Sequence, residues 1–199
     1  MKKLYKSEQS GRSMVEMLGV LAIIGVLSVG GISGYSRAMM KYKLTKTLDQ
    51  ISMITANIRT AFASSPSYAG LTTENARKWG LASSDMYSAA DSKALINPFL
   101  GAVEIVAAQA NSMANMGFAI QYTKLPLDAC VTLATSDWGI AGFSGLTITA
   151  AGTDGKVAAV AAGGEATTKP DGTTGLISFA TAANLCTHET NNGVTIFFY

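Results

Sequence analysis

Few residues in this chain have the types and spacing that catalysis or metal binding requires. The sequence contains a single histidine, His188, and two cysteines, Cys130 and Cys186, which are too few for the usual four-ligand His/Cys metal site. Its carboxylates are scattered, with no spacing that indicates an acid–base pair, and its glycine-rich stretches lack the lysine pattern of a phosphate-binding loop. We therefore expect no catalytic residue, no metal site and no cofactor.

Glu16 is the acidic residue whose position indicates a specific role. It lies immediately before residues 17–35, MLGVLAIIGVLSVGGISGY, which contain no charged side chain. A carboxylate inside hydrocarbon costs roughly 2.5–3.5 kcal/mol on insertion scales, and an ordinary signal peptide gains nothing from one at this position. The simplest interpretation is a solvated charge at the edge of a membrane.

The apolar run itself is long enough to cross a membrane. At about 1.5 Å per residue a helix over residues 17–35 is ~28 Å long, close to the ~30 Å hydrocarbon core of a bilayer. The lysines that precede it, at positions 2, 3 and 6, predict that the N-terminus stays cytoplasmic and that the rest is exported. The run is either a secretory signal peptide, cut near Ser33-Gly34, or a membrane helix that the mature protein retains.

The composition excludes several classes of protein. The chain has 199 residues, of which 48% are hydrophobic and only 14% are charged, with 15 basic and 13 acidic side chains. Nucleic-acid binding needs a clustered basic surface, and intrinsic disorder needs low hydrophobicity with high net charge. Neither description fits, and the apolar bias argues against a soluble cytosolic enzyme.

Beyond the apolar run, the sequence predicts that the helix continues to about Ala63. Apolar residues recur three or four positions apart, which is the pattern of an amphipathic helix with one face that must be buried. These residues are Met40, Leu44, Leu48, Ile51, Ile54, Ile58 and Phe62. Ser64-Ser65-Pro66 ends the helix, because proline disfavours helical conformation at the residue before it.

The remaining sequence predicts one exported α+β domain. A short helix capped by Thr72 or Thr73 ends at Gly80, and further helices are expected over residues 125–135, with Pro126 near the start, and 176–186. Strands are expected over residues 102–108, 117–122, 146–150, 156–162 and 194–199, with a hairpin turn at 153–155. We expect an antiparallel sheet of four to five strands packed on the apolar stripe of the long helix.

Residues 11–16, Gly-Arg-Ser-Met-Val-Glu, together with the apolar run, resemble the type III signal of type IV pilins. The resemblance implies that a prepilin peptidase cuts after Gly11 and that the new N-terminal residue, Arg12, is N-methylated. Glu16 then becomes the fifth mature residue, whose carboxylate pairs with the terminal ammonium of a neighbouring subunit during assembly. One departure is that the family usually has Phe, Met or Leu where this chain has Arg12.

The cysteines are either two buried free thiols or a disulfide, and export to the oxidising periplasm favours a disulfide between Cys130 and Cys186. The segments around them, residues 125–130 and 185–199, resemble type IVb pilins of the toxin-coregulated and PilS-like kind. This resemblance implies that residues 130–186 form a surface-exposed variable region.

The resemblance implies a structural subunit of a type IVb pilus that is a homopolymer. The expected division is a cleaved leader (1–11), a transmembrane and filament-core helix (12–35), an amphipathic half of the helix (36–63) and a head domain (64–199). The expected course is insertion into the inner membrane with the head in the periplasm, then assembly into an extracellular filament for adhesion, aggregation or conjugation. The expected partners are the peptidase, the assembly platform and its ATPase, with no nucleic acid. The alternatives are a minor pilin, a type II secretion pseudopilin and, less favoured, a membrane-anchored periplasmic domain.

Overall fold

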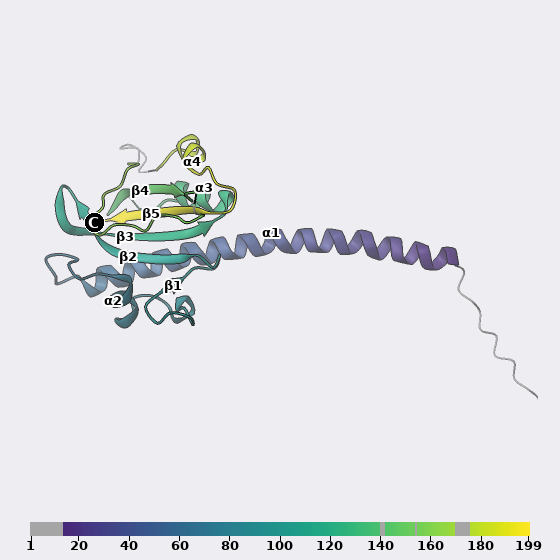
Figure 1. Ribbon diagram of the computed structural model, residues 1–199, viewed down its shortest axis with the longest axis horizontal. Helices are drawn as coiled ribbons and strands as arrows, with labels where there is room; N and C mark the ends of the chain where they lie inside the picture. Colours follow the sequence, from purple (N-terminus) through teal and green to yellow (C-terminus); the bar gives the residue numbers. More distant parts are fainter. Residues whose placement is uncertain (1–13, 140–141, 154, 170–175) are drawn as a thin grey trace, which may run out of the picture. The chain divides into compact units, whose positions relative to one another are not determined.

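The computed structural model describes residues 14–139, 142–153, 155–169 and 176–199 (Figure 1). The chain divides into two compact units, one that ends at Tyr42 and one that comprises Lys43–Tyr199. Between Met14 and Tyr42 the first unit is entirely α-helical. In its described residues, the second unit contains the rest of that helix, three further α-helices, a 3-10 helix and the sheet.

Helix α1 spans Met14–Ala61 without interruption, in agreement with the predicted range where the structure describes it. In the first unit the large apolar side chains from Met14 to Tyr35 are all exposed, with exposed fractions between 48% and 83%. In the second unit the predicted stripe is buried. Ile51, Ile54 and Ile58 are completely buried, and Leu44, Leu48 and Phe62 pack partly buried against the same core.

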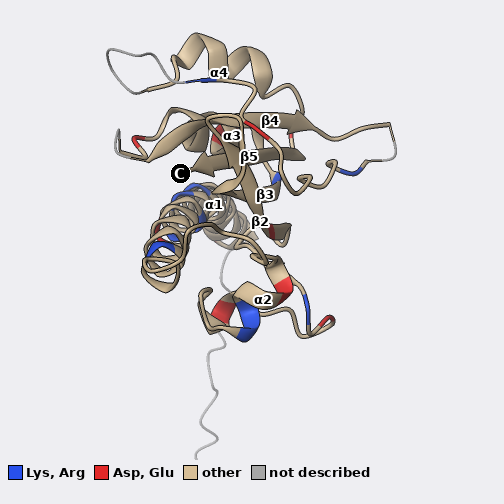
Figure 2. Ribbon diagram, turned by 90° about the vertical axis from the view of Figure 1, so that its left-hand side faces the viewer, with Lys and Arg blue, Asp and Glu red and all other residues tan. Residues whose placement is uncertain are grey.

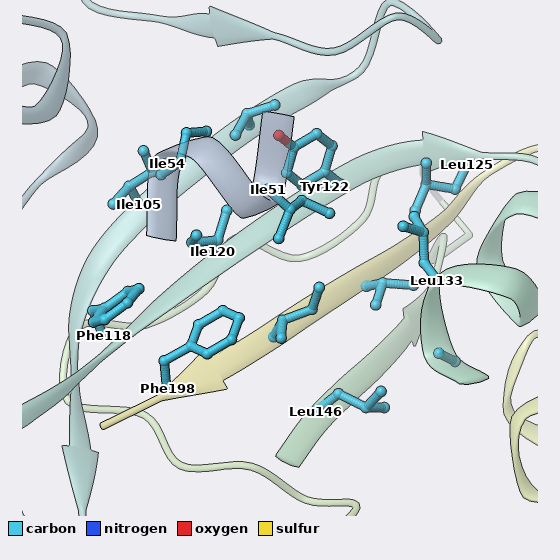
Figure 3. Packing of buried hydrophobic residues seen from close by; sticks show 14 of the residues in the cluster. Ile51, Ile54, Ile105, Phe118, Ile120, Tyr122, Leu125, Leu133, Leu146 and Phe198 are labelled. Atoms are coloured by element: carbon cyan, nitrogen blue, oxygen red, sulfur yellow. The ribbon is translucent and has the colours of Figure 1, made fainter. Parts of the chain in front are cut away.

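The sheet has five antiparallel strands in the order β1-β2-β3-β5-β4 (Figure 1). The strands are β1 (Leu95–Ile96), β2 (Ala102–Ala110), β3 (Met113–Leu125), β4 (Phe143–Ala150) and β5 (Asn192–Phe198). One face of the sheet packs on α1, and there Ile105, Ile120 and Tyr122 surround Ile51 and Ile54 (Figure 3). The α+β architecture predicted from the sequence is confirmed.

One strand was not predicted, and the predicted strands differ at their ends, as in β4, which begins at Phe143 and not at Leu146. The two-residue strand β1 was not expected, because so short a segment has no detectable alternation. Strand β3 begins at Met113 and not near residue 117, so the β2–β3 hairpin turns at Asn111 and Ser112, which both have positive φ. The predicted turn at 153–155 includes Asp154, which lies outside the described residues.

The predicted strand over residues 156–162 is wrong. This segment has no regular secondary structure and lies across the other face of the sheet. The Gln121 side chain donates to Ala158 O (3.0 Å) and accepts from Val160 N (3.2 Å), and Glu104 also accepts from Val160 N (3.1 Å). The segment has the apolar composition of a strand because its two valines are half-buried against the sheet face. Their burial does not come from strand pairing.

The short helices agree with the sequence apart from their ends. Helix α2 (Thr73–Lys78) is capped by Thr72, whose hydroxyl accepts from Asn75 N (3.2 Å), and Gly80 follows with positive φ. A 3-10 turn that was not predicted, η1, spans Ser84–Met86. Helix α3 spans Leu127–Thr135 with Pro126 as its N-cap, since Leu125 ends β3 instead. Helix α4 spans Phe179–Leu185, shorter at both ends than predicted.

Candidate assembly site

Glu16 lies in the first turn of α1 and is exposed. A negative charge there interacts favourably with the N-terminal end of the helix dipole. Within the described residues Glu16 makes neither an ion pair nor a hydrogen bond, and it is the sole charged residue between Met14 and Ser36. Gly11 and Arg12, the predicted cleavage and methylation positions, lie outside the described residues. Cleavage, methylation and the role of Glu16 therefore stay predictions.

The segment that carries Glu16 is apolar on all sides. By length and composition alone, α1 contains a stretch that could cross a membrane. Glycines 19, 25, 30, 31 and 34 lie on the same part of the helix, and none has a non-neighbouring atom within 4 Å of where a Cβ would be. A large exposed apolar surface of this kind marks a contact with lipid or with other protein chains.

Cys130 and Cys186 are joined by a disulfide bond, with 6.0 Å between their Cα atoms. Cys130 lies in α3 and Cys186 directly follows α4, and both are buried. The bond closes a loop over a sequence separation of 56 residues. On the chain-entropy model such a loop stabilises the fold by ~4 kcal/mol. The pairing that the sequence favoured is thus present in the second unit.

A polar contact between α1 and η1 could not be found from the sequence. Lys46 Nζ lies 2.7 Å from Asp85 Oδ2, and Gln50 Nε2 donates to the same oxygen at 3.3 Å. Hydrogen bonding from Lys46, followed by Ser83, lowers the pKa of Asp85 below its usual 3.8. No motif relates these positions, because only the tertiary fold places η1 beside α1.

Tyr122 is completely buried in the core, near enough to Asp85 to feel its charge. Its hydroxyl points towards the α1 side of the core (Figure 3), where it has no hydrogen-bond partner among the described residues. Burial raises the pKa of the Tyr122 hydroxyl far above its usual 10, with a smaller contribution from the charge of Asp85. Tyr122 is therefore neutral at any physiological pH and acts in packing.

Residues for which the sequence predicted no chemical role have structural roles. His188 Nδ1 accepts from Thr190 N (3.2 Å) and Asn191 N (3.1 Å), which shapes the turn before β5. Trp138 Nε1 donates to Leu133 O (3.1 Å). Acidic and basic residues are interspersed along the chain around α2 (Figure 2), and Lys78 Nζ lies 2.8 Å from Glu74 Oε1 in an ion pair. Among the described residues, no group of three or more His, Cys, Asp or Glu could hold a metal ion.

Comparison with known proteins gives the family. The family model described as "PilS N terminal" matches residues 41–198. The chain belongs to the PilS family of type IVb pilins. The match covers the second unit, so the family is established by the part of the chain that contains the sheet and the disulfide.

Two curated pilins resemble this PilS-family chain. The major structural subunit of the bundle-forming pilus of Escherichia coli O127:H6 is 28% identical over 138 residues, which is 69% of this chain and 70% of that protein. The toxin coregulated pilin of Vibrio cholerae serotype O1 is 31% identical over 135 residues, which is 66% of this chain and 59% of that protein. The sequence resemblance to type IVb pilins is confirmed.

A solved structure shows the same fold as this PilS-family chain. The crystal structure of TcpA, a type IV pilin from the Vibrio cholerae El Tor biotype, matches with a TM-score of 0.54 at 22% identity. The match covers 78% of this chain and 98% of that one. The long N-terminal helix and antiparallel sheet are therefore the pilin arrangement, as predicted.

Proposed function

We propose that this chain is a structural subunit of a type IVb pilus and that it polymerises through the N-terminal part of α1. The observation that carries the proposal is the exposed apolar segment of α1, whose single charge is Glu16 in the first turn. Membership of a pilin family and likeness to major pilus subunits support it. The proposed role is structural and not catalytic.

Before assembly, the subunit is held in the inner membrane by α1 with its head in the periplasm. The leader of residues 1–11 is cytoplasmic, and a prepilin peptidase removes it by cutting after Gly11. Methylation of the amino group of Arg12 follows. An assembly platform and its ATPase then move the subunit from the bilayer into the extracellular filament.

Glu16 guides this transfer by charge pairing. Its carboxylate is costly in an apolar environment, and a partner cation recovers much of that cost. The ammonium at Arg12 of a neighbouring subunit is the cation that the motif supplies. Pairing therefore favours one axial register of each incoming helix.

The proposed division of labour follows the chain. Residues 12–35 form the core of the filament, residues 36–63 attach the head to it, and residues 64–199 form the head. The region between the cysteines, 130–186, faces outward, where adhesion, aggregation or mating contacts would take place.

An intact-mass measurement on filaments sheared from cells that express the chain tests the proposal. We expect the mass of residues 12–199, less two hydrogens for the disulfide and plus one methyl group. This species should be the dominant filament protein, which distinguishes a major subunit from a minor pilin or a pseudopilin. A chain cut near Ser33-Gly34, or one that remains full-length in the membrane, contradicts the proposal.

A further inference from the structure

A groove runs along α1 within the second unit, beside the loop that follows α3. Its lining comes from four α1 residues, from two residues of that loop and from β5, and its volume is about 230 Å³. The lining residues are Ser52, Thr55, Ala56, Arg59, Asp137, Trp138 and Phe198. Neither the disulfide nor the proposed pairing of Glu16 involves this groove.

Thr55 is the residue that makes the groove unusual. Its side chain is 9% exposed, yet its hydroxyl has no hydrogen-bond partner among the described residues. The hydroxyls of Thr47 and Thr60 in the same helix donate to the carbonyl four residues earlier, at 2.8 and 2.9 Å. A buried hydroxyl without a partner costs free energy, so a group that binds in the groove and pairs with Thr55 removes that cost.

The groove is lined by one basic side chain (Arg59), one acidic side chain (Asp137) and the aromatic rings of Trp138 and Phe198. The Arg59 guanidinium lies 5.7 Å from the centre of the Phe198 ring. Asp137 Oδ1 accepts from Gly139 N at 2.9 Å, a local bond that shapes the loop after α3. Arg and aromatic residues are enriched at the centres of protein interfaces, and a groove with both a cation and an anion suits a polar protein surface better than a free anion.

The exposed side of α1 next to the groove has mostly short side chains, with the half-exposed Met53 at its edge. Residues three or four positions apart share a helix face, and here they are Thr45, Asp49, Ser52, Ala56 and Thr60, all exposed. Small residues at this spacing allow a second backbone to approach closely.

We propose that the groove at Thr55 and Ala56 receives a second copy of this chain in the filament. This proposal rests on the proposed function, because α1 also carries the apolar segment through which the copies assemble. In a filament made of one kind of subunit, the protein that packs beside α1 is another copy. A polar group of that copy pairs with the Thr55 hydroxyl, and the small residues admit its backbone.

Ala56→Leu tests the groove by filling it, with Ala61→Leu as the matched control. Both alanines are exposed residues of α1, and the two positions lie on different sides of the helix, since five residues correspond to a rotation of about 140°. We expect A56L to reduce the mass of sheared filaments at least about tenfold relative to the wild type, and A61L to leave it unchanged. The Tm of the full chain in detergent should be the same for all three proteins. Wild-type filament mass from A56L overturns the proposal.

A photo-cross-linking amino acid at Ser52 in the full chain separates the groove from the proposed function. We expect illumination of intact cells to give a product of twice the subunit mass in which both parts are this chain. Filaments without this product overturn the groove proposal and leave the pilus function standing. The same product in a strain without filaments shows that the contact forms outside the filament and overturns the proposal. Cross-linking to lipid or to another protein alone also overturns the proposal.

Discussion

Lys46 and Asp85 form an ion pair of 2.7 Å that joins α1 to the 3-10 turn η1. Gln50, one helical turn further along α1, donates to the same carboxylate oxygen. The contact fastens the polar edge of the helix to the head domain, beside a core in which Ile51 and Ile54 are completely buried. The Lys46–Asp85 contact thus joins α1 to the head through polar groups, in addition to the buried apolar stripe that the sequence predicted.

Asp85→Asn should lower the free energy of unfolding by about 0.5–1 kcal/mol. The side chains of Lys46 and Asp85 are 37% and 39% exposed, so solvent screens the pair and its contribution stays in the range of surface ion pairs. Chemical denaturation of D85N, of Lys46→Met and of the double variant measures the pair as a double-mutant cycle. Purely additive effects of the two substitutions would contradict a direct interaction.

The contribution of Asp85 should depend on pH in a defined direction. Its pKa is lowered in the folded state from the usual 3.8, so the stabilisation is fully present above that value. It is lost as the pH falls through the lower pKa of the folded protein. We expect the stability difference between wild type and D85N to be constant from neutral pH down to about pH 5 and to shrink below pH 4. A difference that grows on acidification has the opposite sign and would exclude this assignment.

Glu16→Ala should abolish or sharply reduce filaments and leave the head domain folded. The reason is that the carboxylate lies outside the second unit, where all the core contacts of the head are made. Filament mass and the Tm of the detergent-solubilised chain measure the two effects. Glu189→Ala, a substitution of an exposed acid of the second unit that lies away from the groove, controls for removal of a negative charge. Normal filament yield from E16A would sink the charge-pairing hypothesis.

Serine at Cys130 or Cys186 should destabilise the head by about 2–5 kcal/mol, the usual cost of removing a native disulfide. The two substitutions should be equivalent, because each removes the same bond between buried sulfur atoms. Thermal unfolding with and without a reductant makes the comparison. Under reducing conditions the wild type should approach the variants. A persistent gap between C130S and C186S would point to a role for one thiol beyond the bond.

Features that depend on residues close together in the chain could be predicted from the sequence. The uncharged run after Glu16, the three-to-four spacing of Ile51, Ile54 and Ile58, and the cap at Thr72 are signals between residues close in the chain. A helix repeats every 3.6 residues, so its buried face can be derived from spacing alone. The antiparallel sheet was predicted from strand patterns joined by short turns. The disulfide was predicted because export exposes the two cysteines to the oxidising periplasm.

Contacts between residues distant in the chain were decided by the tertiary structure. Residues 156–162 have the apolar composition and flanking turns of a strand, but Gln121 and Glu104 hold them across the sheet face, and no local pattern distinguishes burial on a face from pairing at an edge. The Lys46–Asp85 pair and the groove at Thr55 likewise depend on where η1 and the loop after α3 come to lie against α1. Burial and pairing are properties of the packed chain, because they depend on neighbours that only folding brings together.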